Sequence, residues 1–549
     1  MSDLKTMMQR LDKNWPRLTG FECLSQGIVN NKSLLLYLCV IGVLAYAGDI
    51  FTFSLNIDSE NHAFEFGAKG GWAMQGRWGM YVLSALLLPD AVMPIIPILI
   101  AVVGAVVGAV FFVHILSPVR SAADYVAAPF LIACPVIYFA FYFTTLGYGL
   151  GIAFAVSGFG MYLLTKKEWP TTIAAAVCFC FSIAIYQAIL PLLAAIFSLF
   201  IVSLIIASDA VKLRCLIVYA IHFLAAVIVG YVASVLINKL VLHYNQWSFD
   251  SGYIYNFVNY QFTKSYLIEA LEKTFIAGKN YYTGGKDYYL YNLVSLKLLF
   301  TVTLLATLFR IICAPVAWGF RVLALLLLLA AIAAPMAMHM LNNGYMPPRT
   351  VLGVPQVLAG LVFFAMGVRS NVLRSIVALL TVVCLYNFCV ANNRYAFSNY
   401  MVWQADRELS TKIQQQIAKV LPKIAPVNDP NASYPMELVG WIEYPETPIF
   451  TQREVVGASF YKWAAGDVGR TEGLFKTMGI VKYRAATREE RLSVIEQAQA
   501  MPSWPYEGSV DVINGIIVIK FREYNPNQLM VICQPPLDTT EVCKKYYPQ

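Results

Sequence analysis

Residues 92–116 read VMPIIPILIAVVGAVVGAVFFVHIL, an apolar stretch without a single Asp, Glu, Lys or Arg. A helix needs about 20 mainly apolar residues to cross the roughly 30 Å hydrocarbon core of a bilayer. Apolar runs of this kind recur from Ser33 to Asn392, whereas the rest of the chain is polar. The stretch therefore predicts one of several membrane-spanning helices.

The overall composition also indicates a membrane protein. Of the 549 residues, 58% are hydrophobic and 13% are charged, whereas a soluble domain has about 25% charged residues. The formal net charge of +8 does not indicate nucleic-acid binding, because the basic residues are spread over short loops and do not cluster on one face. We expect membrane lipid as a partner and no nucleic acid.

The apolar runs predict a polytopic α-helical protein with about 11 transmembrane helices. The candidate spans are 33–53, 92–116, 121–143, 145–164, 171–189, 191–208, 215–238, 291–309, 321–340, 350–367 and 373–392.

The basic residues predict the orientation of these spans. If the N-terminus lies inside, the inner segments hold fourteen Lys and Arg residues, whereas the short outer loops hold only Lys69, Arg77 and Arg349. Basic residues near span ends favour the cytosolic side. An odd number of spans then places the C-terminal part outside.

Three parts follow from this reading: a basic cytosolic arm at 1–32, a transmembrane domain at 33–392 with outer loops 54–91 and 241–290, and an outer soluble domain at 393–549. The last part has the signals of an α+β fold. They are a capping box at Thr487-Arg488-Glu489-Glu490, a hairpin over 510–521 turning at Asn514-Gly515 and a strand over 437–444. We expect this domain to bind an acceptor or to support the membrane site.

Two cysteines, Cys533 and Cys543, fall in the outer domain. Thiols on the oxidising side of a membrane usually pair, so we predict a disulfide, the alternative being two free thiols. Cys178 and Cys180 lie in an apolar span without a nearby His or carboxylate, which favours core packing over a metal site. The sequence specifies no cofactor and leaves dependence on a divalent ion open.

No cytosolic loop is long enough for a nucleotide-binding βαβ unit with its glycine loop. The sequence Gly147-Tyr148-Gly149-Leu150-Gly151 joins two predicted spans, and we interpret it as a tight interhelical turn. Any chemistry is therefore expected on the outer side, with an activated substrate delivered on a lipid.

The first outer loop contains the candidate reaction centre. Asp58-Ser59-Glu60 lies just beyond a span and is followed by Gly71-Trp72 and Gly76-Arg77-Trp78. A carboxylate near the membrane surface can accept the proton of an attacking hydroxyl group, and Asp58 or Glu60 fits that role. The alternative is an acidic, solvated loop beside the membrane.

These residues resemble the start of the serotype-converting glucosyltransferases that modify bacterial O-antigen, a family of the multi-span glycosyltransferase class with lipid-linked donors. Pro347-Pro348-Arg349 resembles the family's Pro-Arg element, and residues 504–510, WPYEGSV, with the following hairpin resemble its closing segment. Members often carry Asp-Asp-Glu where this chain has Asp58-Ser59-Glu60. Which carboxylate is the base therefore stays open.

The resemblance implies transfer of a sugar, usually glucose, from an undecaprenyl-phosphate carrier to the lipid-linked O-antigen of lipopolysaccharide, with inversion at the anomeric carbon. The reaction would occur on the periplasmic face of the bacterial inner membrane. The N-terminus would then be cytoplasmic and the C-terminal domain periplasmic.

Such a displacement places negative charge on the departing phosphate, so cationic groups are needed at the outer face. Arg77 and Arg349 lie in outer loops, and Lys297 lies a short way into the outer end of a span, where a charge is costly. Trp72 and Trp78 flank Arg77 in the candidate substrate loop. The alternatives are an interface anchor for Arg77 and its tryptophans, and snorkelling for Lys297.

The outer loop 241–290 combines many tyrosines with lysines. Aromatic faces suit sugar rings and lysines suit phosphate, but an interfacial helical loop with tyrosines at headgroup depth fits equally. The residues are Tyr244, Trp247, Tyr253, Tyr255, Tyr260, Tyr266, Tyr281, Tyr282, Tyr288, Tyr289, Lys264, Lys273, Lys279 and Lys286.

Two other functions share these features. A transporter or flippase of a lipid-linked sugar usually has ionisable groups near mid-membrane, whereas Asp49, Asp124 and Lys297 lie towards span ends. A polysaccharide polymerase would use similar substrates and would differ in its product, a longer chain in place of a single side-branch sugar.

Overall fold

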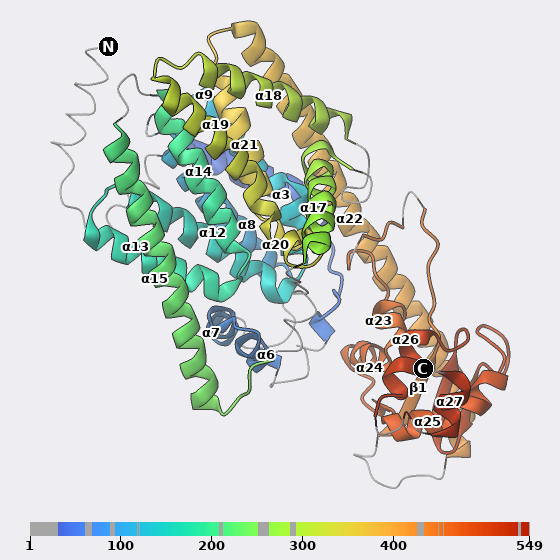
Figure 1. Ribbon diagram of the computed structural model, residues 1–549. Coiled ribbons are helices and arrows are strands. Elements are labelled where there is room, and N and C mark those ends of the chain that lie inside the picture. The colour runs from blue at the N-terminus through green and yellow to red at the C-terminus, as the bar shows by residue number, and fades with distance from the viewer. Residues whose placement is uncertain are drawn as a thin grey trace.

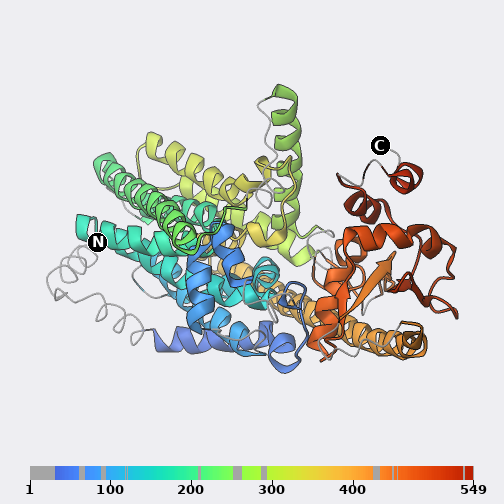
Figure 2. The ribbon, with the colours of Figure 1, turned by 90° about the horizontal axis from the view of Figure 1, so that it is seen from below.

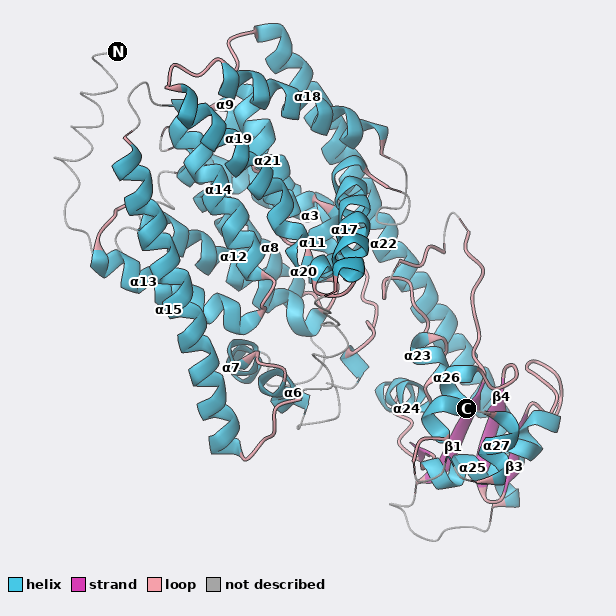
Figure 3. Cartoon of the chain, viewed as in Figure 1, coloured by secondary structure: helices cyan, strands magenta, loops and turns pink. Residues whose placement is uncertain are grey.

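The computed structural model describes residues 31–60, 68–87, 94–117, 119, 121–207, 212–250, 263–285, 293–424, 433–447, 450–453, 455–535, 538 and 540–547. The chain is mostly helical, and its strands lie in the C-terminal part (Figure 3). Most of the predicted arm 1–32 lies outside the described residues. The same holds for part of each long outer loop, including Tyr253, Tyr255, Tyr260, Lys286, Tyr288 and Tyr289.

Helices make up the N-terminal two thirds of the chain (Figure 1). They are α3 (Lys32–Ala45), α4 (Ala47–Phe51), α6 (Ala68–Met74), α7 (Trp78–Leu87), α8 (Ile96–Leu116), α9 (Ala122–Ala127), α10 (Phe130–Ala133), α11 (Pro135–Phe141), α12 (Thr144–Leu164), α13 (Trp169–Ile185), α14 (Ile189–Ala207), α15 (Leu213–Asn245), α17 (Lys264–Thr283), α18 (Val294–Ile312), α19 (Trp318–Ala333), η1 (Ala334–Met336), α20 (Ala337–Met340), η2 (Pro348–Thr350), α21 (Val354–Met366) and α22 (Asn371–Val420).

Seven of the predicted spans coincide with helices long and apolar enough to cross a membrane: α8, α12, α14, α15, α18, α19 with α20, and α22. An eighth is formed if α9 to α11, which are bent by 42°, count as one span. The other three predicted spans fall on α3, α13 and α21, which have 14, 17 and 13 residues. The chain is thus a multi-pass membrane protein, and among its described residues seven or eight of the predicted spans have the length of a full crossing.

Segments that the orientation rule places on the outer side contact one another. The Ser59 hydroxyl lies 3.0 Å from that of Thr144, and Gln187 donates a hydrogen bond of 3.2 Å to the carbonyl of Gln75. Further along, the backbone N–H of Asp250 donates to a carbonyl of the first loop. The predicted outer loops therefore gather at one end of the helices.

Predicted inner segments likewise contact one another. Lys167 Nζ donates to Cys215 Sγ at 3.3 Å, and Arg310 donates to the carbonyl of Phe364 at 2.7 Å. These contacts agree with the prediction that successive loops lie alternately on the inner and the outer side of the membrane.

Glycines allow α8 and α12 to approach closely. A Cβ added to Gly104 would lie 2.2 Å from the carbonyl carbon of Gly151, and one added to Gly108 would lie 2.8 Å from the carbonyl oxygen of Phe154. Small residues at such spacing permit close contact between membrane helices. The interpretation of Gly147 to Gly151 as an interhelical turn is wrong, because all five residues lie inside α12.

Helix α22 joins the two parts of the chain. Its 50 residues correspond to a length of about 75 Å at about 1.5 Å per residue. The predicted last span, 373–392, is the first half of this helix, and the second half continues into the C-terminal part (Figure 1). Seen from below, the end of α22 runs alongside the C-terminal sheet (Figure 2).

The C-terminal part contains a four-stranded sheet in the order β2-β1-β4-β3. Its strands pair parallel at β1–β2 and β1–β4 and antiparallel at β3–β4. The elements are η3 (Leu421–Lys423), β1 (Tyr434–Val439), α23 (Trp463–Gly466), α24 (Val468–Thr477), β2 (Tyr483–Ala485), α25 (Arg488–Ala500), β3 (Val510–Ile513), β4 (Ile516–Lys520), α26 (Pro526–Ile532) and α27 (Glu541–Tyr546).

Several local predictions for this part are confirmed. Strands β3 and β4 form the predicted hairpin, Thr487 and Glu490 form the capping box of α25, and Cys533 and Cys543 form a disulfide. The strand predicted over 437–444 is wrong in its second half, because β1 ends before Gly440, which has a φ of +72°.

We expect Gly104→Ala to destabilise the protein by about 1–3 kcal/mol, because the new methyl group would overlap α12 in a closely packed interface. The matched control is Gly319→Ala in α19, where an added Cβ has no neighbour within 4 Å. The measurement is the thermal midpoint of the full chain in detergent. Equal midpoints for the two variants would contradict close packing at this contact.

Burial raises the pKa of Glu437 to about 7, although its ion pair with Arg491 opposes the shift. Because this pKa lies above the value near 4.3 of an unfolded chain, the folded state takes up the proton first. We expect Glu437 to contribute stability that is lost as pH rises from about 4 to about 7. In Glu437→Gln, the thermal midpoint should fall less over this range, and an unchanged pH dependence would contradict the assignment.

Candidate functional site

The first outer loop is held against the break between α11 and α12. The Asn56 side chain donates to the carbonyl of Tyr142, and the hydroxyls of Ser59 and Thr144 are 3.0 Å apart. The carbonyl of Tyr142 can accept this hydrogen bond because the helix is interrupted there. The break thus fixes the backbone on both sides of Asp58.

Hydrophobic residues attach the same loop to the C-terminal part. Leu55 and Ile57 are buried in a cluster that also contains Ile413 of α22, Phe475 of α24 and Phe521 beyond β4. Because these two loop residues alternate with polar ones, one side of the loop enters this cluster. The loop therefore lies between the membrane helices and the C-terminal part.

The two candidate carboxylates differ in environment. The Glu60 side chain is fully buried, whereas 44% of the Asp58 side chain is exposed. Asp58 has a φ of +77°, a left-handed conformation that is uncommon for residues other than glycine and that clusters at functional sites. Asp58 can therefore meet a substrate more readily than Glu60.

Arg470 of α24 bridges the two carboxylates. Its Nη2 lies 2.8 Å from Asp58 Oδ1, and its Nη1 donates to Glu60 Oε1. The arginine side chain is 17% exposed. It follows Asp467, the N-cap residue of α24, whose side chain accepts from the backbone N–H of Gly469 at 2.9 Å.

Burial and neighbouring charges both shift the pKa values of Glu60 and Arg470 in this bridge. Burial raises the pKa of Glu60, and the charge and hydrogen bond of Arg470 oppose this rise. Burial disfavours the charge of Arg470, but Asp58 and Glu60 outweigh that effect and raise the pKa of the guanidinium. The second oxygen, Glu60 Oε2, is buried without a hydrogen-bond partner among the described residues.

Arg349 approaches the same break from another element. Its guanidinium lies 5.0 Å from the centre of the Phe143 ring. In the chain, Phe143 lies between Tyr142 and Thr144, the two residues that hold the first loop. Pro348 and Arg349 begin η2, Pro347 is its N-cap residue, and η2 contacts α11. The structure thus places Arg349 on Phe143, between the two residues to which Asn56 and Ser59 bind.

Arg77 and its tryptophans form a separate cluster. The guanidinium of Arg77 lies 5.6 Å from the Trp72 ring and 4.9 Å from the Tyr186 ring, and its Nε lies 3.4 Å from Gln187 Oε1. Trp78 contacts Phe181 with ring centres 6.0 Å apart. Arg77 is buried among these rings, which favours an anchoring role, and its predicted role in binding phosphate stays a prediction.

Lys297 is exposed on α18 and forms no ion pair within the described ranges of the chain. The structure therefore gives no contact between Lys297 and the first-loop carboxylates. This exposure agrees with the snorkelling alternative.

The tyrosines of helix α17 belong to the predicted aromatic loop, for which sugar binding and helix packing were the alternatives. Tyr266, Tyr281 and Tyr282 are buried, and the Tyr282 hydroxyl donates to the carbonyl of Ile332 at 2.8 Å. Tyr282 also stacks on Phe300 at 5.2 Å. These three tyrosines pack α17 onto neighbouring helices and do not present a face to a sugar, whereas Tyr244 is exposed.

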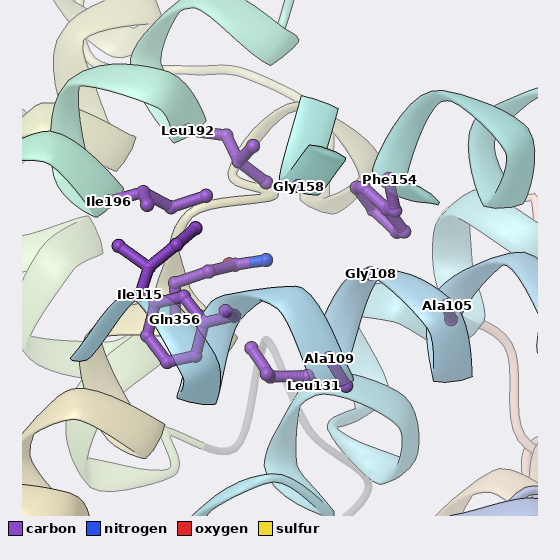
Figure 4. Close-up of a pocket in the computed structure, with 11 residues that line it drawn as sticks. Ala105, Gly108, Ala109, Ile115, Leu131, Phe154, Gly158, Leu192, Ile196 and Gln356 are labelled. Carbon is purple, nitrogen blue, oxygen red and sulfur yellow. The ribbon is translucent and has the colours of Figure 1, made fainter. Parts of the chain in front are cut away.

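A cavity inside the membrane helices is distinct from this site (Figure 4). It lies between α8, α10, α12, α14 and α21, and its lining is apolar apart from Gln356. Its volume of about 20 Å³ has room for one water molecule. It does not have room for a sugar ring.

A buried carboxylate on α22 fixes the segment that leads to α24. Asp406 accepts hydrogen bonds from the Tyr444 hydroxyl at 2.9 Å, the Ser459 hydroxyl at 2.7 Å and the Phe460 N–H at 2.8 Å. Three donors would lose their acceptor if this carboxylate were removed. Asp406 thus positions Ser459 and Phe460, which precede α24 in the chain.

The fold and the site define a multi-pass membrane protein with acidic and basic side chains gathered where its loops meet a C-terminal domain. The chain belongs to the family described as Glucosyl transferase GtrII, whose family model matches residues 50–366, more than half of its length. The family expected from the sequence is thereby confirmed, and the protein is a glucosyltransferase. A search of curated protein sequences found no match.

Asp58, Glu60 and Arg349 were candidates because of their loops, whereas Arg470 was not predicted. Asp58 and Glu60 share Arg470, and Arg349 packs on Phe143 at the α11–α12 break. Arg470 is separated from Glu60 by 410 positions in the chain. No local pattern distinguishes it from other arginines of the C-terminal part.

We expect Asp406→Ala to lower the free energy of unfolding by about 3 kcal/mol, because buried donors lose their acceptor. Glu408→Ala is the matched control, since Glu408 lies on the same helix and pairs with Lys412 at the surface. Thermal unfolding of both variants in detergent provides the measurement. Equal midpoints would show that the Asp406 hydrogen bonds do not hold this segment.

Proposed function

We propose that this protein transfers a glucosyl group from a polyprenyl-phosphate donor, undecaprenyl-phosphate glucose, to a sugar of O-antigen on the periplasmic face of the inner membrane. The family match supports glucosyl transfer. The observation that carries the proposed site is the position of the loop with Asp58 and Glu60, which is held at the α11–α12 break against which Arg349 also packs.

The positions of the long polar segments in the chain support a lipid-linked donor. The predicted inner segments are short, and the long polar segments belong to the end that holds the carboxylates. A donor carried by a membrane lipid can reach this end by lateral diffusion. The acceptor, a lipid-linked saccharide, would approach the same surface.

The proposed reaction is a single displacement at the anomeric carbon. A carboxylate of the first loop takes the proton of an acceptor hydroxyl. The oxygen of this hydroxyl forms a bond to the anomeric carbon while the bond from that carbon to the phosphate oxygen breaks. The polyprenyl phosphate leaves with the electron pair, and a cation such as Arg349 or Arg77 stabilises its charge. Attack opposite the leaving group inverts the anomeric carbon.

The first test is the mass of the lipopolysaccharide repeat in cells with and without this chain, in a host that makes undecaprenyl-phosphate glucose. We expect one added hexose per repeat. An unchanged repeat with altered chain length would favour a polymerase, and no change in either would favour a transporter.

Substitutions test the carboxylates in the same cells. We expect Asp58→Asn and Glu60→Gln each to lower hexose addition by about 100-fold or more, which is a typical contribution of acid–base catalysis. Glu489→Gln, which changes an exposed carboxylate at the start of α25, is the control and should retain full addition. Full addition by both site variants would remove these carboxylates from the reaction.

A further inference from the structure

The arginine at the site comes from outside the part of the chain that matches the family. Arg470 lies on α24, whereas the family match ends at residue 366. Its two terminal nitrogens bind different carboxylates, one each from Asp58 and Glu60. A planar guanidinium holds two such acceptors in a fixed geometry, which an ammonium group does not.

Two carboxylates and one guanidinium leave the cluster with a net negative charge when both acids are ionised. Within the described residues, Arg470 is the only Lys or Arg side chain that forms an ion pair with either acid. Tyr142, at the same break, also interacts electrostatically with both acids. Without Arg470, neither carboxylate would keep an ion-pair partner among the described residues.

The two acids are placed differently around the arginine. Glu60 is enclosed, so its charge depends on the guanidinium, because an unpaired buried charge is strongly disfavoured. Asp58 is bound through Oδ1 and is 44% exposed. One side of the Asp58 carboxylate is therefore accessible while its orientation is held.

We propose that Arg470 is a positioning residue contributed by the C-terminal domain, which uses Glu60 as a buried anchor and orients Asp58 to accept the proton of the acceptor hydroxyl. The inference rests on the proposed glucosyl transfer and deepens it by assigning different roles to the two acids. The proton moves from the hydroxyl to Asp58, while Arg470 and Glu60 neither gain nor lose a proton. The transfer site is complete only when α24 lies against the first loop.

The experiment measures glucose transfer by the purified full chain in detergent between pH 5 and pH 9. The donor is labelled undecaprenyl-phosphate glucose, and the acceptor is lipid-linked O-antigen from the host whose lipopolysaccharide gains the hexose. The variants are Arg470→Gln and Arg470→Lys. The matched control is Arg491→Gln, because Arg491 forms a similarly buried pair with Glu437 at 2.8 Å in the same domain.

Arg470→Gln should lower kcat about 100-fold near neutral pH and move the acidic limb of kcat/KM to higher pH. The limb moves to higher pH because, without the cation, the two acids keep a shared proton up to a higher pH. Arg470→Lys should retain more activity and shift the limb in the same direction by a smaller amount. Arg491→Gln should lower the thermal midpoint and leave the acidic limb in place.

An acidic limb at the wild-type position in Arg470→Gln would overturn the inference, even if the rate fell, because it would indicate a purely structural loss. Activity above wild type would also overturn it, since Arg470 would then block the site. If Arg470→Gln does not fold, an unshifted limb in Arg470→Lys overturns the inference on its own. Absence of transfer by the wild-type chain would instead contradict the proposed function.

Discussion

The hydrocarbon core of a bilayer contains no water, so each backbone amide within it must be bonded inside the protein. This constraint explains why the N-terminal two thirds of the chain is helical and why its helix breaks are buried against other protein segments. The break at Tyr142–Thr144 is an instance, because the Tyr142 carbonyl accepts a hydrogen bond from Asn56. An interrupted helix thus supplies the attachment point for the loop that carries the candidate carboxylates.

The same constraint excludes most charges from the helices and concentrates them at the ends. At the end where the predicted outer loops meet, Asp58, Glu60, Arg349 and Arg470 come from three distant parts of the sequence. Their partial burial strengthens the interactions between unlike charges, because the local dielectric constant is lower than that of water. A small set of charged residues is therefore sufficient to build a defined site there.

The C-terminal domain contacts the rest of the chain at several places in addition to the helix that connects them. Helix α22 continues without interruption from the membrane helices into this domain, and Asp406 binds the segment before α24 to it. Leu55 and Ile57 insert from the other side into the cluster that contains Phe475. These contacts place Arg470 of this domain against Asp58 and Glu60 of the first loop.

Features that depend on neighbouring residues could be predicted from the amino-acid sequence. They are the apolar runs, the capping box of α25, the hairpin of β3 and β4, and the loop positions of Asp58, Glu60 and Arg349. The packing of the chain revealed that Gly147 to Gly151 lie inside α12 and that β1 pairs in parallel with β2 and β4. It also brought Arg470 to the two carboxylates, an ion pair that no local sequence pattern indicates. The physical reason is that periodicity and capping act over a few residues, whereas an ion pair between positions 60 and 470 exists only after the domains have packed.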